Sequence, residues 1–137
     1  MWERPGAVSI VAGSGEGRTE LTAFDHALMD AGIANLNFLR VTSILPAGVK
    51  VIPVPPLIPG TLTPCVYARI TSHTPGERIA AAVGMGRSHT HHGVIMEFSH
   101  RGTGENAEGI VRGMVEEAMA MRGLQVDEVL VAVKDHV

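Results

Sequence analysis

Residues 35–71 read NLNFLRVTSILPAGVKVIPVPPLIPGTLTPCVYARIT. Three runs in this stretch predict β-strands, at Asn35 to Thr42, Lys50 to Val54 and Leu62 to Thr71. No helical run separates them, and the loop between the second and third is rich in proline, which does not pair in the middle of a sheet. Consecutive strands argue against a purely parallel α/β sheet. They favour mixed sheets with helices on their outer faces.

Helices are predicted on either side of this stretch. The segment from about Thr22 to Ala31 places apolar residues at helical spacing, and Gly32 supplies a stop. The segment from Glu105 to Arg122 has the clearest helical pattern and ends at Gly123. Helices are therefore expected before and after the three central strands.

A third helix is predicted to begin at Thr74. Thr74 is a good N-cap, Pro75 suits the first helical position, and Glu77 can complete a capping box. We expect this helix to run through the alanines at 80–82 and to fade by Gly84. Further strands are predicted at Ala7 to Ala12, Val94 to Phe98 and Glu128 to Val133, which gives the order β-α-β-β-β-α-β-α-β.

Composition limits the class of protein. The 137 residues fit one domain, 1–137, and 45% hydrophobic residues exclude a disordered chain. A net charge of -3 with no block of like charge argues against a nucleic-acid partner. Charged residues make up only 18%, which suggests that some surface is hidden against another subunit.

The chain has one cysteine, Cys65, which excludes a disulfide framework and a cysteine-rich zinc site. No apolar run is long enough to span a membrane. We therefore expect a soluble cytoplasmic protein.

Two motifs suggest ligands without specifying one. The turn from Gly13 to Gly17 follows a strand and precedes a helix, but it lacks the spacing of a dinucleotide or Walker motif. His89, His91 and His92 cluster without a carboxylate or cysteine at ligand spacing, so no metal site is predicted.

Two carboxylates have both a structural and a functional interpretation. Asp25 could complete a capping box begun by Thr22, or it could receive a cation whose aliphatic part lies along Leu21 and Leu28. Glu97 lies in an apolar strand, where it could point outward, or be buried as a neutral acid able to donate a proton.

Taken together, the chain resembles the pyruvoyl-dependent arginine decarboxylase family. The resemblance follows nearly the whole chain in order. The Thr-Ser-Ile-Leu-Pro segment, combined with the other matching segments, is specific for this family. The matching segments are Val8 to Ser14, Ala23-Phe24-Asp25 with Ala27-Leu28, Ala31-Gly32-Ile33 with Asn35 and Asn37, Arg40 to Pro46, Pro75-Gly76-Glu77, Ile95 to Phe98, and Met121-Arg122-Gly123.

The resemblance implies that the chain cuts itself between Thr42 and Ser43. Ser43 would attack the Thr42 carbonyl, and elimination and hydrolysis would turn Ser43 into an N-terminal pyruvoyl group. The products would be a β chain, 1–42, and an α chain, 43–137. Asn37 would help to hold the scissile bond.

The resemblance also implies the reaction and the site. L-Arginine would form a Schiff base with the pyruvoyl group and lose CO₂ to give agmatine, which feeds polyamine biosynthesis. Glu97 would donate the proton, Asp25 would pair with the guanidinium, and Leu21 and Leu28 would flank the methylenes. The implied fold is α+β, a four-layer α-β-β-α sandwich with mixed or antiparallel sheets. It would assemble as a homotrimer of processed αβ units with active sites between subunits.

Three alternatives stay open at this point. The same chemistry could act on another amino acid, such as histidine or ornithine. The chain could be an unprocessed, inactive homologue. It could also be a small-molecule-binding module that uses the turn from Gly13 to Gly17.

Overall fold

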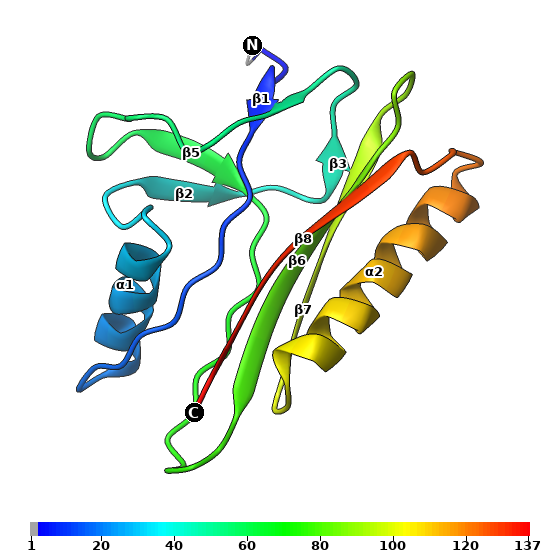
Figure 1. The fold of residues 1–137 in the computed structure, drawn as a ribbon. Coiled ribbons are helices and arrows are strands. Elements are labelled where there is room, and N and C mark those ends of the chain that lie inside the picture. The colour runs from blue at the N-terminus through cyan, green and yellow to red at the C-terminus, as the bar shows by residue number, and fades with distance from the viewer. Residues whose placement is uncertain (1–2) are drawn as a thin grey trace.

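A computed structural model describes residues 3–137 of the chain. Figure 1 traces the strands and helices between a first strand near the N-terminus and a long last strand that ends at the C-terminus. Their bounds are β1 Ala7–Val8, α1 Glu20–Asp30, β2 Asn37–Arg40, β3 Ile44–Leu45, β4 Lys50–Val51, β5 Leu62–Cys65, β6 Ile79–Arg87, β7 Gly93–His100, α2 Gly104–Met121 and β8 Glu128–His136.

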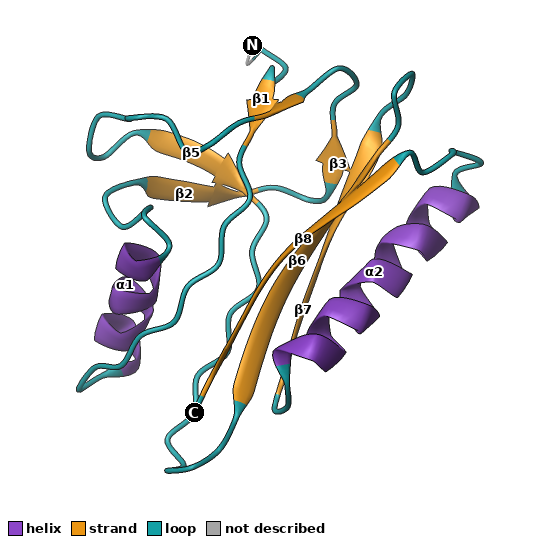
Figure 2. Ribbon diagram, viewed as in Figure 1, coloured by secondary structure: helices purple, strands orange, loops and turns teal. Residues whose placement is uncertain are grey.

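The largest sheet has the strand order β3-β7-β6-β8, with every neighbouring pair antiparallel. Helix α2 covers one face of it, as Figure 2 shows on the right of the view. Small residues of β6 allow the helix to come close. A Cβ atom added at Gly84 would lie 3.2 Å from Val111 and Val115, and one added at Gly86 would lie 2.5 Å from Val115.

The predicted helix at 74–84 is wrong, because most of this segment belongs to strand β6. Only a turn forms at its start, where the Glu77 N–H donates to the Thr74 carbonyl at 3.1 Å and Gly76 has a φ of +83°. Alanine favours helices in isolation, but Ala80 and Ala82 lie in the core beneath α2 with Val111. Packing against α2 therefore outweighs the local helical propensity.

The opposite face of the large sheet packs against the first part of the chain. Leu45, Val49 and Met85 are buried here, and Val8, Ile10, Ile95 and Leu130 pack around them. Two short parallel pairs, β1 with β4 and β2 with β5, lie on this side.

Helix α1 lies beyond the parallel pairs, on the side away from α2 (Figure 1). The α+β class expected from the sequence is confirmed. The order of layers runs from α1 through the short strands and the large sheet to α2, although the second layer consists of two separate pairs and not one continuous sheet.

The glycines of the Gly13–Gly17 segment allow it to pack closely against α1. A Cβ at Gly13, Gly15 or Gly17 would come within 2.3–2.6 Å of the backbone of α1, at Ala27 or Ala23. All three glycines therefore face the helix and let an extended segment lie directly against it. Nothing in this arrangement presents the turn as a phosphate cradle, so the loop gives no support to a nucleotide-binding module.

Much apolar surface of the single chain is uncovered. Helix α1 contains no buried residue, and Leu21, Met29, Ile58 and Leu62 are each more than 60% exposed. Within residues 3–137, no helix is long and apolar enough to cross a membrane.

Candidate active site

Glu97 lies on β7, on the face of the large sheet turned away from α2. Its strand neighbours Met96 and Phe98 pack in the core beneath α2, whereas Ile95 packs on the opposite side. Side chains alternate along a strand, so Glu97 shares the side of Ile95. The carboxylate therefore faces the layer that holds β2 and β5, and does not point outward.

Arg40, the last residue of β2, holds this carboxylate. Its Nη2 atom donates to Glu97 Oε1 at 2.6 Å and to the Tyr67 carbonyl at 2.9 Å. The other oxygen, Glu97 Oε2, is buried and has no hydrogen-bond partner in the described part of the chain. Glu97 is thus bound through one oxygen only.

The Thr42–Ser43 bond lies between β2 and β3, beside the same strand. The Ser43 carbonyl accepts a hydrogen bond from the Ile95 N–H at 2.7 Å, and Ile44 pairs with Val94. Glu97 follows Ile95 by two residues, which is about 7 Å along a strand. Backbone pairing therefore places Ser43 opposite Ile95, two residues along β7 from Glu97.

Cys65 completes the immediate surroundings. It pairs with Arg40 across the β2–β5 ladder and is half-buried. Burial raises the pKa of the Cys65 thiol, with a smaller opposing effect of Arg40 and a further raising effect of Glu97. The thiol therefore stays neutral beside Arg40 and Glu97.

Asp25 lies in the middle of α1 and not at its cap. Thr19 is the N-cap, and it exchanges hydrogen bonds of 3.1 Å with Thr22, so the capping-box interpretation of Asp25 is wrong. The Asp25 side chain is exposed and makes no hydrogen bond or ion pair with any residue from 3 to 137. It is free to bind a ligand.

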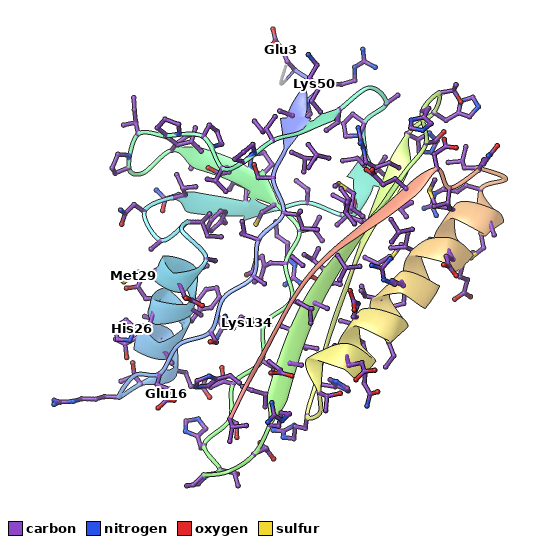
Figure 3. The ribbon with its side chains drawn as sticks, in the orientation of Figure 1. Glu3, Glu16, His26, Met29, Lys50 and Lys134 are labelled. Atoms are coloured by element: carbon purple, nitrogen blue, oxygen red, sulfur yellow. The ribbon has the colours of Figure 1, made fainter. Side chains whose placement is uncertain are left out.

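Leu21 and Leu28 flank Asp25 in different ways. Leu21 is 73% exposed, whereas Leu28 is half-buried. Met29, one helical turn after Asp25, is 61% exposed and projects from the outer side of α1 in Figure 3. The carboxylate thus lies on an apolar strip of the helix that is open to solvent, and it does not contact Ser43 or Glu97 of its own chain.

Asn37 begins β2, at the opposite end of the strand from the Thr42–Ser43 bond. Its amide donates to the Gly60 carbonyl at 3.0 Å. Within one chain it therefore braces the neighbouring loop and not the scissile bond.

The histidine cluster has structural contacts. The His89 and His91 backbone N–H groups donate to Asp127 and Ser88. Between residues 3 and 137, no group of histidine, cysteine and carboxylate side chains could hold a metal ion.

Sequence reasoning missed Arg40 and Tyr67. The Arg40 guanidinium lies 4.6 Å from the centre of the Tyr67 ring, and that ring lies 6.1 Å from Phe24 of α1. The only signal in the sequence was a charged residue inside an apolar strand. Nothing there showed that its partner lay 57 residues further on.

Comparison with known proteins supplies the family. Residues 7–136 match the family described as pyruvoyl-dependent arginine decarboxylase. A relative from Methanocaldococcus jannaschii with that name is 42% identical over 91% of this chain and 77% of its own length. Others from Thermococcus sibiricus and Methanococcus maripaludis are 42% and 36% identical over 98% of the chain, covering 87% and 84% of their lengths. The chain belongs to the pyruvoyl-dependent arginine decarboxylase family.

Proposed function

We propose that the chain is a self-processing enzyme that converts L-arginine to agmatine and CO₂. The observation that carries this proposal is the hydrogen bond that holds Ser43 against β7, beside a buried and unpartnered Glu97 oxygen. Membership of the family supports the reaction type and the pyruvoyl cofactor.

Processing would begin with Ser43. Its hydroxyl oxygen attacks the Thr42 carbonyl carbon, the Thr42–Ser43 amide bond breaks, and an ester forms in its place. Elimination then releases residues 1–42 with a carboxylate end. Water hydrolyses the resulting unsaturated residue and releases ammonia, which leaves residues 43–137 with an N-terminal pyruvoyl group. Serine suits this role because its oxygen can serve as both nucleophile and leaving group.

The residues around position 43 fit such a group. The Ile95 N–H holds the carbonyl of residue 43, and Glu97 supplies an orphaned polar atom nearby. When formed, the pyruvoyl group supplies a carbonyl that accepts the substrate amine and withdraws the electron pair left as CO₂ departs.

Glu97 would deliver the proton that replaces CO₂. A general acid needs an oxygen free to carry and donate a proton. Oε1 is occupied by Arg40, whereas Oε2 is free of hydrogen bonds within residues 3–137. We assign the transferable proton to Oε2.

Asp25 would bind the substrate guanidinium through a charge-assisted contact, with Leu21 and Leu28 along the methylenes. A carboxylate at Asp25 favours arginine over histidine or ornithine as the substrate, because a planar guanidinium can donate two parallel hydrogen bonds to a carboxylate.

The exposure of Asp25 and the distance of Asn37 from the scissile bond suggest that a neighbouring subunit completes the site. We propose a homotrimer of processed units, for which the exposed apolar surface provides support. A cytoplasmic location is part of the same proposal, since a single cysteine suits a reducing compartment.

Intact-mass measurement tests the processing step. Wild-type chain should separate into two pieces, residues 1–42 and 43–137, the larger with the mass of a pyruvoyl terminus. Ser43→Ala should remain whole at 14.5 kDa and have no activity, because alanine lacks the attacking oxygen. Ser99→Ala, which changes a serine on the same strand as Glu97, is the control and should cleave normally. Wild-type chain that stays whole after prolonged warm incubation would contradict the proposal.

A further inference from the structure

We infer that Arg40 is a positioning residue for Glu97: its guanidinium holds Oε1 and so fixes Oε2 as the oxygen that donates the proton. This inference rests on the proposed role of Glu97 as the acid. In the donating step the Oε2–H bond breaks and a C–H bond forms with the electron pair left by CO₂. Glu97 then becomes a carboxylate, and its new charge lies against a guanidinium already in place.

The guanidinium is held on both sides, so it can act as a fixed support. One nitrogen, Nη2, bonds both Glu97 Oε1 at 2.6 Å and the Tyr67 carbonyl at 2.9 Å. The Tyr67 ring lies under the guanidinium at 4.6 Å, and Phe24 lies beside that ring. Phe24 in turn carries the Arg69 guanidinium at 4.3 Å from its centre. The contacts from Glu97 through Arg40 and Tyr67 to Phe24 therefore link β7 to α1.

A purely structural ion pair on the same sheet looks different. Arg78 and Asp135 are joined at 3.1 Å, with side-chain exposures of 47% and 34% against 55% and 34% for Arg40 and Glu97. Yet Asp135 uses both oxygens, since Oδ2 accepts from the Gly104 N–H at 2.8 Å. Glu97 keeps one oxygen buried and unused. Native structures seldom leave a buried polar atom unpartnered without a reason, and proton donation supplies one here.

The remaining titratable neighbour does not disturb this arrangement. Cys65 faces Arg40 across the ladder, and burial raises the pKa of its thiol. The thiol adds no negative charge that would compete with Glu97 for the guanidinium. Glu97 is therefore the one carboxylate that Arg40 contacts within residues 3–137.

Steady-state kinetics and stereochemistry test the inference in the processed enzyme. Arg40→Gln should lower kcat by about 100-fold, the size of effect expected when a catalytic group is displaced by about 1 Å, with little change in KM. Arg40→Lys should recover part of kcat because it keeps the charge but loses the planar fork. Arg78→Gln is the matched control and should change neither parameter.

Decarboxylation in D₂O gives the readout that a merely structural role would not change. Wild-type enzyme should place deuterium at the carbon that lost CO₂ in one configuration, because the acid is fixed on one side. Arg40→Gln should give a mixture of configurations, and Arg78→Gln a single one. An Arg40→Gln enzyme with normal kcat and a single configuration would overturn the inference.

A measurement that needs no activity separates this inference from the proposed function. In the Ser43→Ala chain, urea midpoints of Arg40→Gln, Glu97→Gln and the double variant report on the contact itself. Non-additive shifts are expected, and additive shifts would overturn the positioning contact even if the wild-type enzyme is active. A wild-type chain that never cleaves, with non-additive shifts retained, would instead refute the proposed function. If Arg40→Gln does not fold, Arg40→Lys carries both tests.

Discussion

Asp30 joins three distant segments at the end of α1. The Ser14 N–H donates to its Oδ2 atom at 2.9 Å, and Lys134 Nζ of β8 lies 3.7 Å from the same atom. The hydrogen bond from Ser14 is the main reason why the pKa of Asp30 is lowered from 3.8, and the charge of Lys134 adds to it. A lowered pKa means that the ionised carboxylate stabilises the folded chain.

The Asp30 contact should therefore depend on pH. Its stabilisation is fully present above the unfolded pKa of 3.8 and is lost as pH falls through the lower folded pKa. We expect Asp30→Asn to lower the urea midpoint of the Ser43→Ala chain at pH 7, and the difference to shrink towards pH 3. Lys134→Gln should show a smaller loss, since the bond from Ser14 survives. Equal losses for Asp30→Asn at both pH values would contradict this account.

The sequence predicted some residues of the candidate site better than others. Glu97 stood out because a carboxylate in an apolar strand needs an explanation, and the structure gives it a buried oxygen. Arg40 did not, because its meaning depends on a contact across two sheets. Asp25 was assigned a possible capping role, since the start of α1 was placed near Thr22 and not at Thr19. Local patterns thus identify reactive residues more readily than their partners.

At the scale of elements, the close packing of α2 on β6 depends on missing side chains. Gly86 is buried against Val115, whose branched side chain is stiff. Gly113, on the exposed side of α2, has nothing within 4 Å of an added Cβ. These two glycines therefore make a matched pair, one needed for packing and one not.

Opposite effects are expected for the two glycines. Gly86→Ala should destabilise the Ser43→Ala chain by about 1–3 kcal/mol, because the new methyl group forces Val115 and the helix to move. Gly113→Ala should stabilise it by about 0.5–1 kcal/mol, the usual gain on replacing glycine inside a helix. Urea unfolding measures both. A neutral Gly86→Ala would show that α2 is less tightly seated than the structure indicates.

The elements themselves show what sequence patterns can and cannot predict. The helix expected at 105–122 is α2, Gly104–Met121, because its apolar periodicity and its glycine stop agree. The strand expected at 62–71 shortens to Leu62–Cys65, and that at 50–54 to Lys50–Val51. The limits of a strand depend on where its partner strand ends. The segment at β6 forms a strand because it pairs with β7 and β8 and packs against α2. Such partners lie far along the chain.

At the scale of the whole molecule, the residues of the proposed site fall into two groups within one chain. Ser43 and Arg40 each bond to β7 of the large sheet, Ser43 at Ile95 and Arg40 at Glu97. Asp25 lies on α1 and is exposed, with no contact from the described part of the same chain that would cover it. A low content of charged residues and several exposed apolar side chains fit an assembly that brings the two groups together.

Subunit complementation tests whether the two groups meet across an interface. Asp25→Asn and Glu97→Gln should each cleave but decarboxylate poorly when expressed alone. Co-expressed in equal amounts, they should recover about a quarter of wild-type activity, since a site shared by two chains is intact when each chain supplies its unaltered half. Ser43→Ala mixed with Glu97→Gln is the control. Ser43 is hydrogen-bonded to the same strand of the same chain that carries Glu97, so no mixture rebuilds a site with both residues, and no recovery is expected. Recovery absent from both mixtures would mean that Asp25 and Glu97 serve the same site from the same chain, and that the exposed strip of α1 closes onto its own sheet.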